Sequence, residues 1–312
     1  MHTMSEAEGF FDLQVNGYGG VDFNRPDLAA GDLHRACERL AADGVGGILA
    51  TITTEALDRM AACLANVAAL RERDPLAERL IAGFHIEGPF INEVPGYRGA
   101  HPADCIRPGN VDEMKRLLDA AGGFVRLVTI APERDAGLAM TRLLARQGVI
   151  VSAGHCDPDL DQLRAAIDAG LSMFTHLGNG CPNQIPRHDN IIQRALSLSG
   201  RLWLCFIGDG VHIPLFALGN YLRVAGLEKT VVVTDAVAPA GLGPGTYGHG
   251  RFAITVRDDG AARIAGTEQL CGAALPLRGC FENLVRHVGL SEADARRLTV
   301  TNPRRAIGLP GR

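Results

Sequence analysis

The sequence predicts a (β/α)8 barrel, and two observations support that prediction. First, eight short and almost uninterrupted apolar runs recur along the chain, which is typical of strands buried on both faces of a parallel sheet. Second, amphipathic segments separate most of these runs, and several of them end in glycine, a common residue just beyond a helix C-terminus. Strands that alternate with helices indicate a parallel sheet, and eight of them favour a closed barrel.

The predicted elements follow one another along most of the chain. The strands are FDLQV (11–15), GGILATI (46–52), LIAGFHI (80–86), VRLVTI (125–130), VIVSA (149–153), LSMFT (171–175), LWLCFI (202–207) and TVVVT (230–234). The helices are 33–44, 57–73, 110–122, 137–148, 158–170, 275–289 and 291–308. Asp157 and Asp159 flank the start of the fifth helix, as N-cap residues do.

One segment interrupts the alternation after the eighth strand. Residues 245–267 resemble two strands joined by Asp258-Asp259-Gly260, which predicts an inserted β-hairpin. The chain contains no evident linker, repeat or low-complexity segment. We therefore expect residues 1–312 to form a single barrel domain with this hairpin as an insertion.

Composition excludes several classes of function. A net charge of -4 and a pI near 6.2 give no electrostatic basis for binding nucleic acid or an anionic membrane. No apolar stretch reaches transmembrane length, and the polar N-terminus does not resemble a secretory signal. The eight cysteines are scattered without a CxxC pair, as is typical of reduced thiols, so we expect a cytoplasmic protein.

A polar residue stands directly beyond four of the predicted strands. These residues are Glu87 after LIAGFHI, His155 after VIVSAG, His176 after LSMFT and Asp235 after VVVT. In a parallel barrel the C-terminal ends of the strands open onto one face, where catalytic groups gather. Each residue alone has a simpler explanation, such as a structural histidine or a helix N-cap. Their occurrence at four separate strand ends favours one shared site.

The residue types at these four strand ends predict a single-metal hydrolase. Two neutral imidazoles and a carboxylate suit one divalent ion, Zn²⁺ foremost and Fe²⁺, Co²⁺ or Mn²⁺ as alternatives. Such an ion lowers the pKa of water, and a second carboxylate can carry the proton from that water to a leaving amine. We assign the metal to Glu87, His155 and His176, and the proton transfer to Asp235.

Two further sets of inward-facing residues lie near these strand ends. Gln14 and Asn16 share one face of the first strand. Amides are poor ligands, which favours one ion rather than two, although the pair is equally compatible with hydrogen bonds to neighbouring loops. His85 lies two residues before Glu87 and faces the same way, so we expect it to orient a ligand rather than bind the ion.

The loops after the strands carry candidate substrate contacts. His101 lies near the end of the Gly/Pro-rich segment GYRGAHP (96–102), where an imidazole could polarise a substrate carbonyl. Asn179 and Gly180 closely follow the second histidine, so their backbone N–H groups could bind substrate. Arg187 could bind an anion or be a solvent-exposed or interface arginine, and His212 lies in the loop after the seventh strand.

Nine motifs in this chain recur together in one known family. They are FDLQVNGYGGVDFN (11–24), HIEGPFIN with GAHP (85–92, 99–102), VTIAPE (128–133), VSAGH (151–155), THLGNGCP (175–182), DGVH (209–212), VTDAVAPAG (233–241), LCGAALPL (270–277) and TNPRRAIGL (301–309). As an ordered set, they resemble the N-acetylglucosamine-6-phosphate deacetylase family of the amidohydrolase superfamily. Each motif alone is weak, but together they cover nearly the whole chain.

The resemblance implies a distorted, TIM-like barrel of the amidohydrolase type that forms a homodimer. It implies Glu87, His155 and His176 as metal ligands, Asp235 as general base and acid, and His101 as the carbonyl-polarising group. The implied substrate contacts are Ala100, His101, Asn179, Gly180, Arg187, His212, Leu270, Cys271 and Gly272. The implied reaction removes the acetyl group from N-acetylglucosamine 6-phosphate, a small molecule, and yields glucosamine 6-phosphate and acetate.

The chain departs from the family pattern mainly on the substrate side. Only about ten residues precede FDLQV, so we expect most of the family's small β-sandwich domain to be absent. The usual aromatic-N-A-M segment is replaced by Gly178-Asn179-Gly180-Cys181, and L-[AS]-G-S by Leu270-Cys271-Gly272-Ala273. Two alternatives therefore remain: deacetylation of an unphosphorylated or different N-acetyl amino sugar, and a non-catalytic barrel that binds a sugar phosphate.

Overall fold

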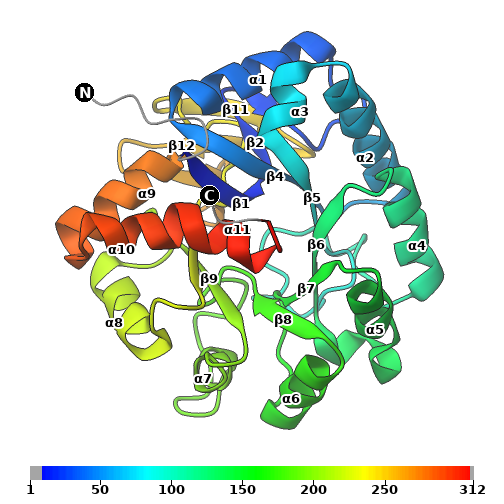
Figure 1. Ribbon diagram of the computed structural model, residues 1–312, viewed down its shortest axis with the longest axis vertical. Coiled ribbons are helices and arrows are strands. Elements are labelled where there is room, and N and C mark those ends of the chain that lie inside the picture. Colours follow the sequence, from blue (N-terminus) through cyan, green and yellow to red (C-terminus); the bar gives the residue numbers. More distant parts are fainter. Residues whose placement is uncertain (1–8, 310–312) are drawn as a thin grey trace.

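The computed structural model describes residues 9–309 and confirms the predicted barrel (Figure 1). Its parallel strands are β1 (Phe10–Val15), β4 (Val45–Thr53), β5 (Ile81–Glu87), β6 (Val125–Ile130), β7 (Ile150–Ala153), β8 (Leu171–Phe174), β9 (Trp203–Ile207) and β10 (Thr230–Val233). They pair in chain order from β1 to β10. Beyond β10, Ala236 bridges to Val15 of β1 and brings the two ends of the sheet together. A two-stranded ribbon, β2 (Gly17–Tyr18) and β3 (Val21–Asp22), follows β1.

The helices surround the strands, and three of them were missing from the sequence prediction. The helices are α1 (Ala30–Ala42), α2 (Leu57–Glu72), α3 (Pro75–Leu80), α4 (Val111–Ala120), α5 (Ala139–Arg146), α6 (Leu160–Asp168), α7 (Ile191–Ser197), α8 (Leu215–Ala225), α9 (Leu277–Asn283), α10 (Glu292–Arg296) and α11 (Asn302–Ala306). The missing helices are α3, α7 and α8. The first two are too short to show a helical period, and α8 exposes apolar Phe216. Within residues 9–309, no helix is long and apolar enough to cross a membrane.

An apolar plug fills the interior of the barrel. The buried inner cluster comprises Phe11, Leu13, Leu49, Leu127, Met173, Cys205, Ile207, Val231, Val233, Ala273, Ala306 and Ile307. Two of these residues lie on or just after α11, and Arg304 of the same helix donates to the Gly9 carbonyl oxygen just before β1, at 3.1 Å. The apolar plug therefore closes the barrel at the N-terminal ends of its strands. Polar side chains gather at the opposite end, where the strands end.

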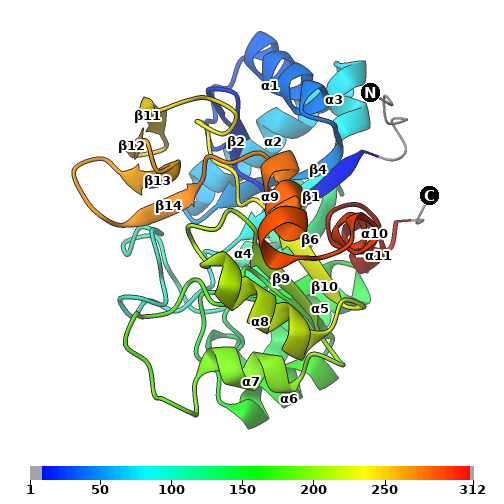
Figure 2. The ribbon, with the colours of Figure 1, turned by 90° about the vertical axis from the view of Figure 1, so that its left-hand side faces the viewer.

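The insertion after the eighth strand is larger than the predicted hairpin. It is a four-stranded antiparallel sheet of β11 (Gly245–His249), β12 (Phe252–Val256), β13 (Ala261–Ile264) and β14 (Leu270–Ala273). The Asp-Asp-Gly turn joins β12 to β13 as predicted, but β14 was missed because its four residues include a glycine and show no clear alternation. Figure 2 shows this sheet beside the barrel, on the same side as the loop that follows β5.

Candidate active site

The structure brings the four strand-end residues together around one cavity of about 480 Å³. Glu87 is the last residue of β5, whereas His155, His176 and Asp235 each lie two residues beyond their strands. All four line the cavity. The oxygen and nitrogen atoms offered by Glu87, His155 and His176 lie within 4.8 Å of one another, and no other such group of potential metal ligands occurs in residues 9–309.

Three of these residues have an unusual backbone conformation. His155, His176 and Asp235 have φ angles of 51°, 34° and 55°, in the left-handed region that favours glycine. Among the described non-glycine residues, only Leu138 shares this feature. Such conformations cost on the order of 1–3 kcal/mol each and tend to occur at functional sites. They turn the chain sharply at the ends of β7, β8 and β10, where these side chains enter the cavity.

The donor atoms of the buried trio fit a divalent cation. Glu87 Oε1 lies 3.2 Å from His155 Nε2 and 2.9 Å from His176 Nε2. The Tyr97 carbonyl oxygen lies 2.8 Å from His155 Nδ1 and accepts a hydrogen bond from it, so the other ring nitrogen, Nε2, faces the carboxylate. Two lone pairs that face one another repel unless a proton or a metal ion lies between them. Two histidines and a carboxylate suit zinc or a similar ion.

Glu87 is held in place by its surroundings. Gln14 Nε2 donates to Glu87 Oε2 at 3.1 Å, and Thr54 Oγ1 donates to the Glu87 carbonyl oxygen at 3.1 Å. Burial alone would raise the pKa of Glu87, but hydrogen bonds from His155 and His176 hold it well below its usual value. Glu87 is therefore an anion, as a metal ligand must be.

Asp235 has a different environment from Glu87. Asn16 Nδ2 donates to Asp235 Oδ1 at 2.7 Å. Burial, followed by the negative charge of Glu87, raises the pKa of Asp235 to about 8. A cation held beside Asp235 would lower this value again. Two nearby carboxyl groups with opposite pKa shifts suit separate roles, one in binding and one in proton transfer.

His101 lies beside the trio on the loop after β5. Its Nε2 is 3.2 Å from His155 Nε2. Burial, and then the charge of His155, lower the pKa of His101 to about 3, so this imidazole is neutral. Gly99 permits the close approach, because a Cβ at that position would lie 2.9 Å from His155 Cε1. A neutral imidazole that carries its proton on Nε2 can donate a hydrogen bond to a carbonyl oxygen in the cavity.

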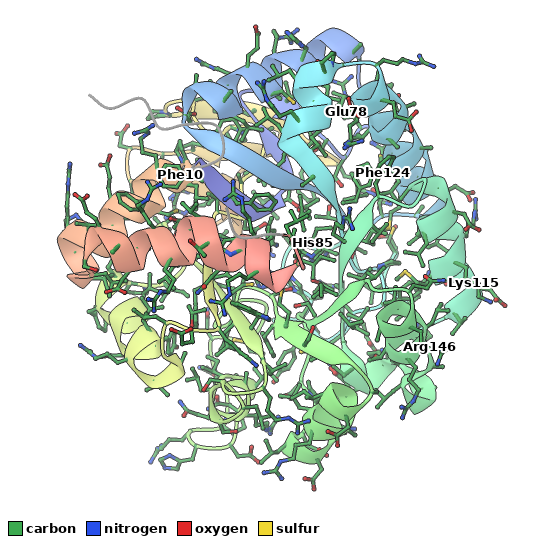
Figure 3. The ribbon with its side chains drawn as sticks, in the orientation of Figure 1. Phe10, Glu78, His85, Lys115, Phe124 and Arg146 are labelled. Carbon is green, nitrogen blue, oxygen red and sulfur yellow. The ribbon has the colours of Figure 1, made fainter. Side chains whose placement is uncertain are left out.

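Figure 3 labels His85 near the centre of the barrel, and on β5 it lies two residues before Glu87. Its Nε2 bonds Thr129 Oγ1 at 2.7 Å, and Thr129 in turn bonds Thr175 at 2.7 Å. Burial lowers the pKa of His85 to about 4. These contacts and one with the Leu13 backbone are to residues other than Glu87, His155 and His176, so its expected role in orienting a ligand remains a prediction.

The candidate substrate contacts fall into two groups. Those that line the cavity are Ala100, His101, Asn179, Gly180, His212, Leu270, Cys271 and Gly272. Within residues 9–309, the buried Asn179 Nδ2 has no hydrogen-bond partner, which suits a donor to a bound ligand. Arg187 is instead exposed and lies outside the lining. Its role as a substrate contact therefore remains a prediction.

Sequence reasoning missed three arginines of the lining. They are Arg59, Arg98 and Arg251. Arg251 pairs with Glu55 and Asp104, whereas no side-chain partner is found within residues 9–309 for Arg59 or Arg98. Arg98 lies inside the GYRGAHP segment and could have been noticed there. The sequence around Arg59 and Arg251 does not indicate a functional site, because arginine is common on helix surfaces and in hairpin turns.

Known proteins of similar sequence and structure are amino-sugar phosphate deacetylases. No protein-family model matches the chain. N-acetylglucosamine-6-phosphate deacetylase of Bacillus subtilis is 30% identical over 303 residues, 96% of this chain and 75% of the relative. N-acetylgalactosamine-6-phosphate deacetylase of Escherichia coli O157:H7 is 30% identical over 304 residues, 97% of this chain and 78% of the relative.

A solved structure shows the same fold. It is a mutant of N-acetyl-D-glucosamine-6-phosphate deacetylase from Mycobacterium smegmatis in complex with N-acetyl-D-glucosamine 6-phosphate. It matches with a TM-score of 0.88 and 34% identity, over 97% of this chain and 78% of that chain. The likeness therefore extends over the barrel, the inserted sheet and the cavity.

Proposed function

Because the chain belongs to the N-acetylglucosamine-6-phosphate deacetylase family, we propose that it hydrolyses the acetamido bond of N-acetylglucosamine 6-phosphate. The products are glucosamine 6-phosphate and acetate. One observation carries this proposal: the buried Glu87, His155 and His176 trio shares a cavity with Asp235. A site that only binds a sugar phosphate needs no general base beside a metal site.

Each residue of the site has a place in the proposed reaction. A divalent ion held by Glu87, His155 and His176, with Zn²⁺ as our first choice, supplies Lewis-acid activation of water. Asp235, held by Asn16, takes a proton from the attacking water and passes it to the sugar nitrogen as the carbon–nitrogen bond breaks. His101 donates a hydrogen bond to the amide oxygen as negative charge develops there.

Relatives of this chain are named for two epimeric amino-sugar phosphates. The family resemblance supports a 6-phosphate, with His212 and Arg187 as its contacts and a homodimer as the working assembly. The Escherichia coli relative is named for N-acetylgalactosamine 6-phosphate at the same 30% identity. The second candidate function is therefore deacetylation of that epimer.

Acetate release by metal-loaded protein tests the proposal. Protein loaded separately with zinc, iron, cobalt or manganese is incubated with N-acetylglucosamine 6-phosphate, its galactosamine epimer and the two unphosphorylated sugars. We expect the fastest release from N-acetylglucosamine 6-phosphate. Faster release from another sugar would reassign the substrate, and no release with any ion, together with measured sugar-phosphate binding, would support a non-catalytic binder.

A further inference from the structure

A buried carboxylate holds the residue that precedes the proposed base. Asp12 of β1 is only 3% exposed, and three donors converge on it. The Gln14 N–H donates to Oδ1 at 3.2 Å, the Thr234 nitrogen lies 3.3 Å from both carboxylate oxygens, and Thr234 Oγ1 donates to Oδ2 at 2.5 Å. Thr234 lies just beyond β10 and directly before Asp235. Asp12 thus links the first barrel strand to the segment that carries the base.

The hydroxyl group of Thr234 also holds the residue that follows the base. The Ala236 N–H donates to Thr234 Oγ1 at 2.9 Å. An oxygen that accepts this hydrogen bond can still donate its own proton. For that proton, the Asp12 carboxylate at 2.5 Å is a closer acceptor than the Gln14 carbonyl oxygen at 3.4 Å. Hydrogen bonds therefore run from Asp12 through Thr234 to Ala236 and span the backbone of Asp235.

Asp235 needs such support because its backbone is strained. Its φ of 55° lies in the left-handed region, where a non-glycine residue stays only if its surroundings hold it. Asn16 Nδ2 bonds the carboxyl group of Asp235, whereas the contacts of Asp12 hold the backbone that aims this group. The backbone alone already joins β1 to this segment, since the Asn16 N–H donates to the Ala236 carbonyl oxygen at 2.7 Å. Closure of the barrel therefore does not by itself require a buried carboxylate, whose burial is costly.

We propose that Asp12 is a positioning residue for proton transfer, which acts through Thr234 to hold Asp235 within reach of the attacking water and the sugar nitrogen. Neither Asp12 nor Thr234 lines the cavity, so both act through Asp235 rather than on the substrate. This inference rests on the proposed function, because it requires Asp235 to carry the proton. It goes further in assigning part of the rate to two residues that the proposed reaction does not use directly.

The charge of Asp12 has an effect of its own, which must be separated from positioning. Burial raises the pKa of Asp12 to about 6, and the hydrogen bond from Thr234 opposes that rise, so Asp12 is a carboxylate at pH 8. Burial and the charge of Glu87 are the main causes of the raised pKa of Asp235, and the charge of Asp12 adds to it. Asp12→Asn alters both the charge and the hydrogen bonds. Thr234→Val removes only the hydroxyl group and nearly preserves the shape of the side chain, so it is the decisive variant.

The turnover of zinc-loaded variants at pH 8 tests the inference. Acetate release from N-acetylglucosamine 6-phosphate, or from whichever of the four sugars named above is cleaved fastest, gives kcat and KM. Thr234→Val should lower kcat by roughly 10–100-fold, since a misplacement of about 1 Å can cost on the order of 100-fold. KM and zinc content should not change. Thr234→Ser keeps the hydroxyl group and should retain most of the kcat. Asp12→Asn should lower kcat in the same way, and it replaces Thr234→Val if that variant does not fold.

Thr230→Val is the matched control. Thr230 is 1% exposed, like Thr234, and lies at the other end of β10, where Oγ1 donates to the Gly226 carbonyl oxygen at 2.6 Å. Each valine variant removes one buried hydroxyl group, so both should lower the thermal midpoint. Only Thr234→Val should lower kcat, which separates positioning of the base from a general loss of structure.

The Asp235→Asn background supplies the second readout. It leaves no carboxylate to position, so adding Thr234→Val should lower the residual kcat no further. An unchanged kcat in Thr234→Val, or a loss that is as large in the Asp235→Asn background as in the unmodified protein, overturns the inference alone. No acetate release by the unmodified protein from any of the four sugars overturns the proposed function and this inference together.

Discussion

The two sides of the cavity are built in different ways. The inner side consists of Glu87, His155, His176 and Asp235, which project from strand ends. The first three are almost fully buried, and Glu87 contacts both histidines, whereas Asp235 is half-buried and held by Asn16. The outer side consists of the β11–β14 sheet and the loop after β5. The sheet packs on Val237 through a small buried apolar cluster, and its turns contact neighbouring loops through solvent-exposed pairs such as the 2.9 Å ion pair between Arg251 and Asp104. Surface ion pairs are individually weak.

This difference indicates where the chemistry and the selectivity reside. The barrel interior fixes the inner side, because moving one ligand would disturb buried hydrogen bonds on neighbouring strands. The outer side can change in sequence without disturbing those strands. The departures of this chain from its family pattern, at 178–181 and 270–273, lie on loops and on the inserted sheet.

The backbone around Asp235 is one place where the two sides meet. The Ala273 N–H of β14 donates to the Asp235 carbonyl oxygen at 2.9 Å, and the Val237 N–H donates to the Ala273 carbonyl oxygen at 3.1 Å. On its other side, the Asn16 N–H donates to the Ala236 carbonyl oxygen at 2.7 Å. The backbone of the proposed base therefore lies between β1 of the barrel and β14 of the outer wall.

The largest expected effect concerns the base on the inner side. Asp235→Asn should lower kcat by roughly 10²–10⁴-fold, the usual contribution of general acid–base catalysis. Bound metal should stay stoichiometric because the three ligands are untouched. Acetate release and metal analysis measure both properties, and Asp168→Asn at an exposed ion pair serves as the control. An Asp235→Asn protein that retains full activity would refute the assignment.

A smaller effect is expected from Gln14, which supports the proposed metal ligand Glu87. Gln14→Leu removes the 3.1 Å hydrogen bond to Glu87 Oε2 and should weaken zinc affinity by roughly 10–100-fold, as loss of a partner behind a metal ligand typically does. Competition with a chelator measures the affinity. Gln147→Leu on the exposed end of α5 is the control. Unchanged zinc affinity in Gln14→Leu would show that Glu87 needs no such support.

The same division explains what could be predicted from sequence. Strand boundaries were predicted to within one residue because doubly buried strands appear as continuous apolar runs. Glu87, His155, His176 and Asp235 could be proposed together because barrel strands end on one face. Gln14 and Asn16 were found by their shared face, although the sequence could not assign Gln14 to Glu87 and Asn16 to Asp235.

The outer side could not be predicted in the same way. Arg251 reaches Glu55 across 196 residues of sequence, and nothing local to either residue indicates that contact. β14 was missed because its pairing with Asp235 and with β13 is non-local, while its four residues have little pattern of their own. The Asp209–His212 pair lay within a quoted motif, but only the 2.7 Å hydrogen bond shows which ring nitrogen Asp209 binds.

The junction between the two sides can be tested with one added methyl group. Gly272 has a φ of 62°, and a Cβ there would lie 2.4 Å from Val237 Cγ1 and 2.7 Å from the Asp235 carbonyl oxygen. Gly272→Ala should destabilise the protein by roughly 1–3 kcal/mol and also lower kcat by displacing Asp235. Gly266→Ala is the matched control, because φ is 79° there and no atom lies within 4 Å of the added Cβ. Equal kcat values for the two variants would contradict the coupling.

The smallest expected effect concerns the outer side of the cavity. It tests whether Arg251 holds the inserted sheet in the position that substrate binding needs. Arg251 donates to Glu55 Oε2 at 2.6 Å and to Asp104 Oδ2 at 2.9 Å, which fastens the turn between β11 and β12 to two barrel loops. Because Arg251 and Asp104 are exposed and only Glu55 is partly buried, Arg251→Ala should lower the thermal midpoint only slightly. KM should rise severalfold as the sheet loosens, while kcat stays close to that of the unmodified protein.

Arg257→Ala is the control for this prediction. Arg257 belongs to the same sheet but pairs only within it, with Glu268, so the KM of this variant should not change. A fall in kcat without a rise in KM would mean that the wall acts on Asp235 through β14 rather than on the substrate, and the two sides would then form one unit.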